Sequence, residues 1–227
     1  SSYRLFQKLR WPDVGPVPCL VKPLTRRALR RPNWPVPINR LVSALTLPLI
    51  RIVARTQPLR AEVRMIQRFD DSFTELWETL APKFAFAVRR DAAYLNWKYV
   101  SAPHVRYSIA ALRRDSRTIG YAVYRHHHEP RGRVTLLADF LTDPDDETAL
   151  PTLLQWVDRE ARAADSDKIR TFAMHALFRR GLRRSGYFQV KSTMEFVARI
   201  NALDVPPSFY EETDTWHVTA GDSDQDR

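Results

Sequence analysis

The stretch RYSIAALRRDSRTIGYAVYRHHHEPRGRVTLLADFL, residues 106–141, contains three runs of strand-forming residues that two short polar turns separate. The runs cover 106–114, 118–126 and 133–141. Alternating β-branched, aromatic and polar residues between turn signals are typical of hairpins. We therefore predict an antiparallel meander of three strands.

The segments on either side of this meander predict a mixed fold. A strand-like run at 63–69 precedes two helices: one runs from a cap at Asp70–Ser72 to Leu80, and the other covers 90–100. The first should bury Phe73, Leu76, Trp77 and Leu80. After the meander we expect a helix from about Leu150 to Ala164, a strand at 168–175, a basic helix ending at Gly186, and last strands at 188–200 and 216–221. The order β-α-α-β-β-β-α-β-α-β-β predicts an α+β (mixed α/β) fold with a central twisted mixed sheet and flanking helices, and it excludes a strictly alternating Rossmann domain.

The positive charge of the chain lies almost entirely in its first quarter. Residues 1–60 hold 12 Lys/Arg and one acid, together with nine of the 16 prolines, whereas residues 61–227 have a net charge of −1. This change in composition predicts a basic, Pro-rich segment at 1–60, a folded domain at 61–220 and an acidic tail at 221–227.

The basic segment has two interpretations. It is either a connector that packs against a neighbouring domain, which we prefer because charge runs alone are weak signals, or a surface for anionic membrane or nucleic acid. Within it, Pro48 should end or kink any helix over Asn39–Arg55.

Compartment and completeness follow from a few residues. One cysteine, Cys19, fits a reducing compartment, and with no apparent signal peptide we expect a cytoplasmic protein. The longest apolar run, Leu41–Ile50, is half the length of about 20 residues that spans a bilayer. Without an initiator Met, the chain is expected to be a fragment or processed product.

Four segments carry a resemblance to a known family. RDAAYLNWKY (90–99), LRRSGYF (182–188) and WHVTAGDSD (216–224), taken with the element order, resemble the second unit of bacterial tandem proteins of the Gcn5-related N-acetyltransferase (GNAT) superfamily. SSYRLFQKLRWPDVG (1–15) resembles the tail of a preceding unit. The resemblance covers about residues 62–220 and implies a partner in that preceding GNAT-like unit, or in a second copy of the chain.

The resemblance implies transfer of an acyl group from acetyl-CoA or another acyl-CoA to an amine-bearing acceptor. In the family the diphosphate lies at a strand–helix junction, on a loop patterned Arg/Gln-x-x-Gly-x-Gly/Ala, because glycine lets backbone N–H groups close on phosphates. The equivalent stretch, LTDPDDETALPTLLQWV (141–157), has no glycine. Its four acids, Asp143, Asp145, Asp146 and Glu147, should carry about −4 at neutral pH and repel a diphosphate. We therefore expect no cofactor on this chain alone.

Other family roles have weak candidates here. The Tyr that serves relatives as a general acid is replaced by Phe6 in the first tail and by Leu182 in the second unit. His175, at a strand end, is a candidate general base, and Asp139 is an acid in an apolar strand that needs a partner if buried. The candidates for contact with the cofactor are the arginines of the last helix, Arg179, Arg180, Arg183 and Arg184.

Two further clusters favour plain structural interpretations. His126, His127 and His128 alternate across a strand, so at most two face one metal, and a polar hairpin end is the better interpretation. Asp222, Asp224 and Asp226 are expected to form a frayed acidic tail and not a calcium loop. We predict no metal site.

Three hypotheses remain open on the sequence. The first is an acyltransferase-family unit without its own acyl-CoA site, which shapes an acceptor pocket or acts as a scaffold. The second is an active FemAB-like acyl- or aminoacyltransferase that uses His175 or Asp139. The third is a basic module that binds membrane or nucleic acid.

Overall fold

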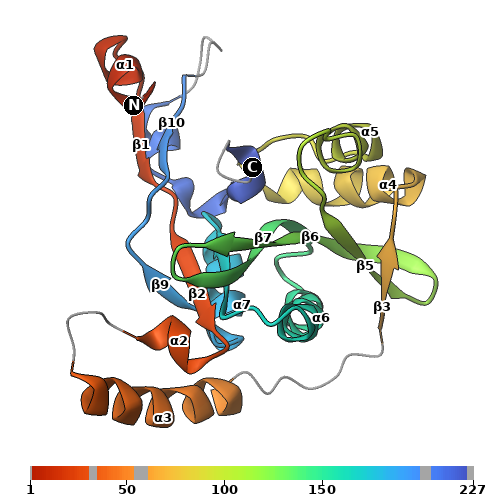
Figure 1. Cartoon of the computed structure of the whole chain (residues 1–227). Helices are drawn as coiled ribbons and strands as arrows, with labels where there is room; N and C mark the ends of the chain where they lie inside the picture. The colour runs from red at the N-terminus through yellow and green to blue at the C-terminus, as the bar shows by residue number, and fades with distance from the viewer. Residues whose placement is uncertain (1, 31–34, 54–60, 200–205, 224–227) are drawn as a thin grey trace.

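A seven-stranded mixed sheet forms the centre of the molecule (Figure 1). The computed structural model describes residues 2–30, 35–53, 61–199 and 206–223. The strand order is β3-β5-β6-β7-β8-β2-β9. The strands are β3 (Glu62–Ile66), β5 (Ser108–Arg114), β6 (Arg117–Glu129), β7 (Gly132–Thr142), β8 (Lys168–Phe172), β2 (Cys19–Pro23) and β9 (Phe188–Val190). The predicted α+β class is confirmed.

The predicted meander forms the middle of this sheet. β5, β6 and β7 pair antiparallel in sequence order. Asp115 and Ser116, in the first turn, have φ of 48° and 67°, which is the backbone geometry of a tight hairpin turn. Leu112, Tyr121 and Phe140 are fully buried, so helices cover both faces of the meander.

Three helical segments form these covers. α4 (Asp71–Leu80) begins where the Asp70 carboxylate accepts a hydrogen bond from the Ser72 backbone N–H, and it buries the four residues predicted from its periodicity. The helix predicted at 90–100 is divided into α5 (Ala92–Leu95) and a π-helical turn, η2 (Asn96–Val100). α4 and α5 lie on one side of the sheet, and α6 (Ala149–Ala163) lies on the other (Figure 1).

A strand from the basic segment lies inside the sheet, which corrects the predicted boundary at residue 61. β2 pairs antiparallel with β8 on one side and with β9 on the other. Leu20 is fully buried, and the buried Lys22 ammonium lies 3.2 Å from the Asp158 carboxylate of α6. At its end, the Asp167 carboxylate accepts a hydrogen bond of 2.6 Å from the Thr25 hydroxyl. Residues 1–60 are therefore not a segment separate from the fold. Their origin in a preceding unit stays a prediction.

The rest of the N-terminal quarter forms smaller elements. α1 (Ser2–Lys8) precedes β1 (Asp13–Pro16), which pairs with β10 (Glu195–Val197), and α2 (Arg26–Leu29) precedes α3 (Val36–Val53). Pro48 lies inside α3, so it does not end the helix, and the alternative that it kinks the helix stays a prediction.

The C-terminal part completes the sheet edge and a second apolar cluster. α7 (Ala176–Arg184) follows β8, and the last strand predicted at 216–221 is found as the two-residue β11 (Trp216–His217), parallel to β4 (Phe86–Ala87). Short 3-10 turns complete the chain: η1 (Ala81–Lys83), η3 (Pro207–Tyr210), η4 (Thr213–Thr215) and η5 (Ala220–Asp222). No helix within the described ranges is long and apolar enough to cross a membrane.

The predicted acidic tail at 221–227 is corrected at its beginning. Asp222 is almost completely buried and lies 2.7 Å from the guanidinium of Arg90, so it belongs to the folded core. Its place is decided by a cationic partner 132 residues away in the sequence. Asp224 and Asp226 lie outside the described residues.

Candidate functional site

β7 and β8 stop pairing halfway along β7. Their parallel pairing runs from Val134↔Lys168 to Leu137↔Thr171, after which β7 continues to Thr142 without this neighbour. The gap is filled by residues 216–222, which we call the C-terminal wedge. The Met174 N–H donates to the Val218 carbonyl at 3.2 Å, and Ala173 forms an antiparallel bridge with Thr219.

The C-terminal wedge fits this gap closely. Trp216, Val218 and Ala220 are buried, and the Trp216 ring packs against Phe86 at a centroid distance of 4.6 Å. A Cβ added to Gly221 would lie 2.0 Å from the Tyr99 hydroxyl oxygen and 3.3 Å from the Ala138 carbonyl oxygen. Such distances leave no room for another molecule between the wedge and β7.

A buried cluster of charges joins the C-terminal wedge to β7. The Asp139 carboxylate lies 3.3 Å from the Arg90 guanidinium, and Arg90 also pairs with Asp222 of the wedge. Asp139 accepts further hydrogen bonds of 3.0 Å from the hydroxyls of Tyr121 and Thr219. Burial raises the pKa of Asp139, and the charge of Arg90 opposes that shift. The expectation that a buried Asp139 has a partner is confirmed, and the carboxylate faces this cluster and not solvent.

His175 lies in an aromatic environment at the start of α7. Its ring is 5.0 Å from that of Phe178 and 5.5 Å from that of Phe84, and the residue is only 5% exposed. Burial, with a smaller contribution from the Arg179 charge, lowers the pKa of His175 to about 4. The imidazole is therefore neutral near pH 7, and its affinity for protons is low. Its predicted role as a general base stays a prediction.

The four acids at the β7–α6 junction are all paired with cations. Lys83 binds Asp143 at 2.6 Å and Asp145 at 2.8 Å. The other two acids pair with three arginines: Asp146 with Arg114, and Glu147 with Arg180 and Arg184. The expected local charge of about −4 is thus balanced by four cations, and this corrects the simple repulsion argument.

The start of α6 nevertheless already holds an anion, the carboxylate of Asp146. It accepts hydrogen bonds from the backbone N–H groups of Thr148 and Ala149, at 2.9 and 3.1 Å, and from the Thr148 hydroxyl. Partial burial acts in the opposite direction, but these bonds and Arg114 lower the pKa of Asp146. A helix N-terminus favours an anion through its free N–H groups. In this protein the anion is its own side chain.

The arginines of α7 also bind groups of the protein. Arg179 donates to the Met174 carbonyl and pairs with Asp214 at 2.7 Å. Arg183 donates to the Gln189 side chain at 2.9 Å. The four arginines predicted to contact the cofactor thus bind four different residues, and only Arg180 and Arg184 face the junction.

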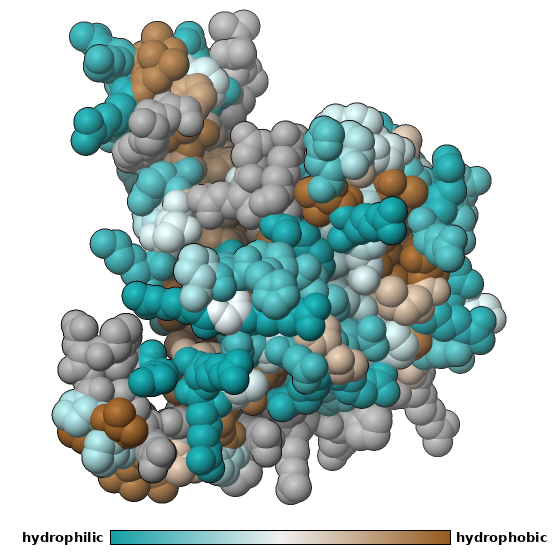
Figure 2. Space-filling model, viewed as in Figure 1, coloured by the Kyte–Doolittle hydropathy of each residue, from teal (hydrophilic) through white to brown (hydrophobic). Residues whose placement is uncertain are grey.

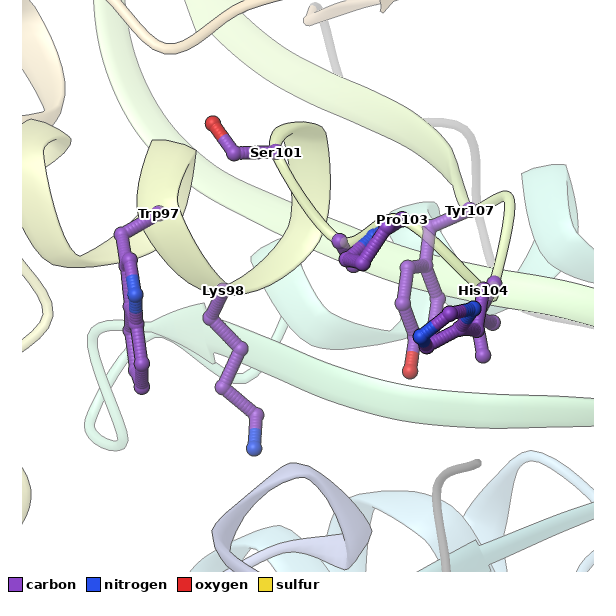
Figure 3. Close-up of a pocket in the computed structure, with 8 residues that line it drawn as sticks. Trp97, Lys98, Ser101, Pro103, His104 and Tyr107 are labelled. Atoms are coloured by element: carbon purple, nitrogen blue, oxygen red, sulfur yellow. The ribbon is translucent and has the colours of Figure 1, made fainter.

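An open pocket lies elsewhere, beside η2 (Figure 3). It has a volume of about 310 Å³, and its labelled lining residues are Trp97, Lys98, Ser101, Pro103, His104 and Tyr107. The side chains of Trp97, Lys98 and Tyr107 extend to the same side of η2 (Figure 3). Trp97 is 67% exposed. This pocket was not predicted from the sequence, although an aromatic residue next to a lysine, with Pro-His just beyond, is a signal for it.

The other residues singled out from the sequence contact neighbouring side chains of the protein. His126 Nδ1 lies 2.9 Å from the Thr135 hydroxyl, and His127 lies 3.3 Å from Glu129. Across the parts of the chain that the structure describes, no three His, Cys, Asp or Glu side chains gather as metal ligands would. Phe6 packs on the Trp11 ring at 4.8 Å, and Leu182 is buried in the core.

Known proteins resemble this chain in structure alone. No family model and no curated protein matches its sequence. A GCN5-related N-acetyltransferase from Anabaena variabilis ATCC 29413 superimposes with a TM-score of 0.54 at 12% identity, over 87% of this chain. The fold is the GNAT fold. The superposition covers 42% of that longer chain.

Two solved structures with lower TM-scores were also found. A probable N-acyltransferase from Enterococcus faecalis V583 matches with a TM-score of 0.46 at 9% identity, over 74% of this chain and 35% of its own. The C-terminal domain of a putative lysylphosphatidylglycerol synthetase from Agrobacterium fabrum matches with a TM-score of 0.41 at 12% identity, over 80% and 56%. In the GNAT fold of the present chain, the β7–β8 gap and the α6 N-terminus both hold groups of the protein itself.

Proposed function

We propose that this chain is a GNAT-fold unit of an acyltransferase-type protein that does not itself bind acyl-CoA, and that it supports a neighbouring catalytic unit. The observation that carries the proposal is the C-terminal wedge, which fills the gap between β7 and β8. Asp146 at the start of α6 supports it, because a diphosphate would have to displace a carboxylate that accepts hydrogen bonds from two backbone N–H groups.

The energetics of opening the gap favour this proposal. Removing Trp216, Val218 and Ala220 from the core exposes two large apolar side chains and a methyl group, at roughly 1.5–3 kcal/mol for each large side chain. Separating Asp222 from the buried Arg90 adds about 3–5 kcal/mol. The total approaches or exceeds the roughly 8 kcal/mol that a ligand of micromolar affinity supplies. Acyl-CoA would therefore bind weakly even if the wedge were displaced.

Two surfaces suit a supporting role. The Trp97 pocket is apolar with a few polar groups, as small-molecule sites usually are, so it is our candidate for an amine acceptor. Leu5 of α1 and Leu9, which follows α1, are exposed beside the β1–β10 pair, and we assign this surface to the preceding GNAT-like unit. In this proposal the acyl-CoA is bound by that other unit. We also propose that the protein is cytoplasmic.

An active FemAB-like enzyme is not favoured by any specific observation. The two residues on which that hypothesis depends, His175 and Asp139, are both buried among side chains of the protein. We therefore do not advance it.

Calorimetric titration of the purified chain with acetyl-CoA tests the proposal. We expect no saturable heat up to about 1 mM ligand, and an unchanged melting temperature, whereas ligand at about 100 times Kd would add about 2.7 kcal/mol of stability. The variant with Arg180→Gln and Arg184→Gln is the control for loose attraction of phosphates to α7. A saturable micromolar Kd for the unsubstituted chain would overturn the proposal, and its loss in the double variant would assign the contact to α7.

A further inference from the structure

α3 exposes a line of apolar side chains that nothing in the described structure covers. Leu41 and Leu45 are 63% and 61% exposed, and Ile38 is 47% exposed. Residues three and four positions apart lie on the same face of a helix, so these three side chains and the exposed Pro48 form one stripe, which we call the α3 stripe. An 18-residue helix is about 27 Å long. The α3 stripe therefore differs from an ordinary protein surface, on which exposed apolar residues are scattered singly.

The α3 stripe stands at the margin of the molecule, next to a short basic helix. Figure 1 shows α2 between α3 and the sheet, so that the outer side of α3 faces away from the core. In Figure 2 apolar side chains gather at this corner, beside hydrophilic surface. α2 contributes exposed Arg26, Arg27 and Arg30, which have no acidic partner among the residues that the structure describes.

The charged residues of the segment that contains α2 and α3 are all cationic. Residues 24–53 contain six arginines and neither Asp nor Glu. Two of the six, Arg40 and Arg51, belong to α3 itself. A segment that combines an apolar stripe with charged residues of cationic type only matches a partner that is apolar inside and anionic at its surface.

We propose that α2 and α3 dock on the surface of an anionic lipid bilayer, with α3 lying in the plane of the headgroups. Amphipathic helices of this kind place their apolar face about 5–10 Å into the boundary between headgroups and acyl chains. Leu41 and Leu45 enter that boundary, while Arg26 and Arg27 contact lipid phosphates. The inference does not rest on the proposed function, since it uses none of the residues around the C-terminal wedge.

The two other partners that such a segment could meet fit less well. A second copy of the chain brings six more arginines and no carboxylate within this segment to oppose them. Nucleic acid satisfies arginines through its phosphates but offers no apolar layer to exposed leucines. A bilayer satisfies both features at once.

Vesicle co-sedimentation with the full chain tests this proposal. One set of vesicles is pure phosphatidylcholine, and the other contains about 30 mol % phosphatidylglycerol, which gives the surface a negative potential. We expect binding to the anionic vesicles, little binding to the neutral ones, and a steep loss as salt is raised, because the Debye length shrinks to about 3 Å at 1 M salt.

Paired variants separate the two parts of the surface. Leu41→Ser with Leu45→Ser should lower the partition coefficient by about tenfold or more. Arg26→Gln with Arg27→Gln should lower it by about thirtyfold. The matched controls are Leu5→Ser with Leu9→Ser, in and just after α1, and Arg106→Gln with Arg117→Gln, which are also exposed. All these side chains are outside the core, so circular dichroism should show unchanged folding.

The outcomes divide cleanly. Loss of vesicle binding in both test pairs and in neither control pair supports the proposal. Absence of binding to anionic vesicles overturns it, as does equal binding to neutral vesicles or binding that the leucine pair does not weaken. Sedimentation velocity adds a last arm: a dimer that Leu41→Ser with Leu45→Ser dissociates, with no vesicle binding, would assign the α3 stripe to a second copy instead.

Discussion

His175 shows how an aromatic environment sets the chemistry of a single side chain. Its imidazole lies between the rings of Phe84 and Phe178 with almost no contact to water. Charging it there requires desolvation of an imidazolium, so burial lowers its pKa from 6.5 to about 4. Between pH 6.5 and about 4, His175 is therefore mostly protonated in the unfolded chain and mostly neutral in the folded chain.

This linkage predicts a loss of stability on acidification. Because the folded pKa is depressed, stability is complete above pH 6.5 and falls as the pH drops towards 4, by about 2 kcal/mol between pH 7 and pH 5. In the His175→Gln variant the pH 7-to-5 difference in the free energy of unfolding should shrink by that amount. Urea titrations at both pH values measure it. An unaltered difference in His175→Gln would contradict the assignment.

Asp139 and the acids at 143–147 show what can be predicted for single residues from the sequence and what cannot. The apolar surroundings of Asp139 correctly required a partner, but the identity of that partner, Arg90, depends on how two distant segments pack. The charge of about −4 predicted at 143–147 is wrong as a net local charge. The cations that balance it come from three separate segments: Lys83, Arg114, and Arg180 with Arg184 on α7.

At the scale of elements, the C-terminal wedge depends on one glycine. Gly221→Ala places a methyl group against the Tyr99 hydroxyl, 2.0 Å away before any relaxation. Overpacking of this kind costs about 1–3 kcal/mol. In a Tyr99→Phe background the obstructing oxygen is absent, so the same substitution should cost less. A double-mutant cycle on chemical unfolding measures the coupling. If Gly221→Ala costs the same in both backgrounds, the Ala138 carbonyl and not Tyr99 is the obstacle.

Elements with local periodicity were predictable, and those that depend on remote partners were not. The meander, α4, α6 and α7 followed from spacing and caps that lie within each segment. β2 has five residues, of which the last is Pro23, and this is too few for a period to show; its partners lie far along the chain. The C-terminal wedge was read as a strand because its residues favour strands, but only Trp216 and His217 form a ladder with β4.

The whole molecule should therefore not divide at residue 61. Without β2, β8 loses its antiparallel neighbour and β9 loses its only place in the sheet. We expect residues 61–227 alone to lack a cooperative thermal transition, and a synthetic peptide of residues 12–24 to restore it when added. Near-ultraviolet circular dichroism during heating reports both results. The same peptide with Leu20→Asp is the control, and a cooperative transition of 61–227 without any peptide would refute the expectation.

The position of β2 also has a consequence for synthesis of the chain. Cys19 pairs with Phe172, so a ribosome working at about 5–20 residues per second makes the second residue roughly 8–30 s after the first. During that interval an apolar strand has left the exit tunnel while the strand it must pair with does not yet exist. Folding of this sheet therefore waits for synthesis of β8, and the nascent chain offers chaperones a defined early binding segment at residues 17–23.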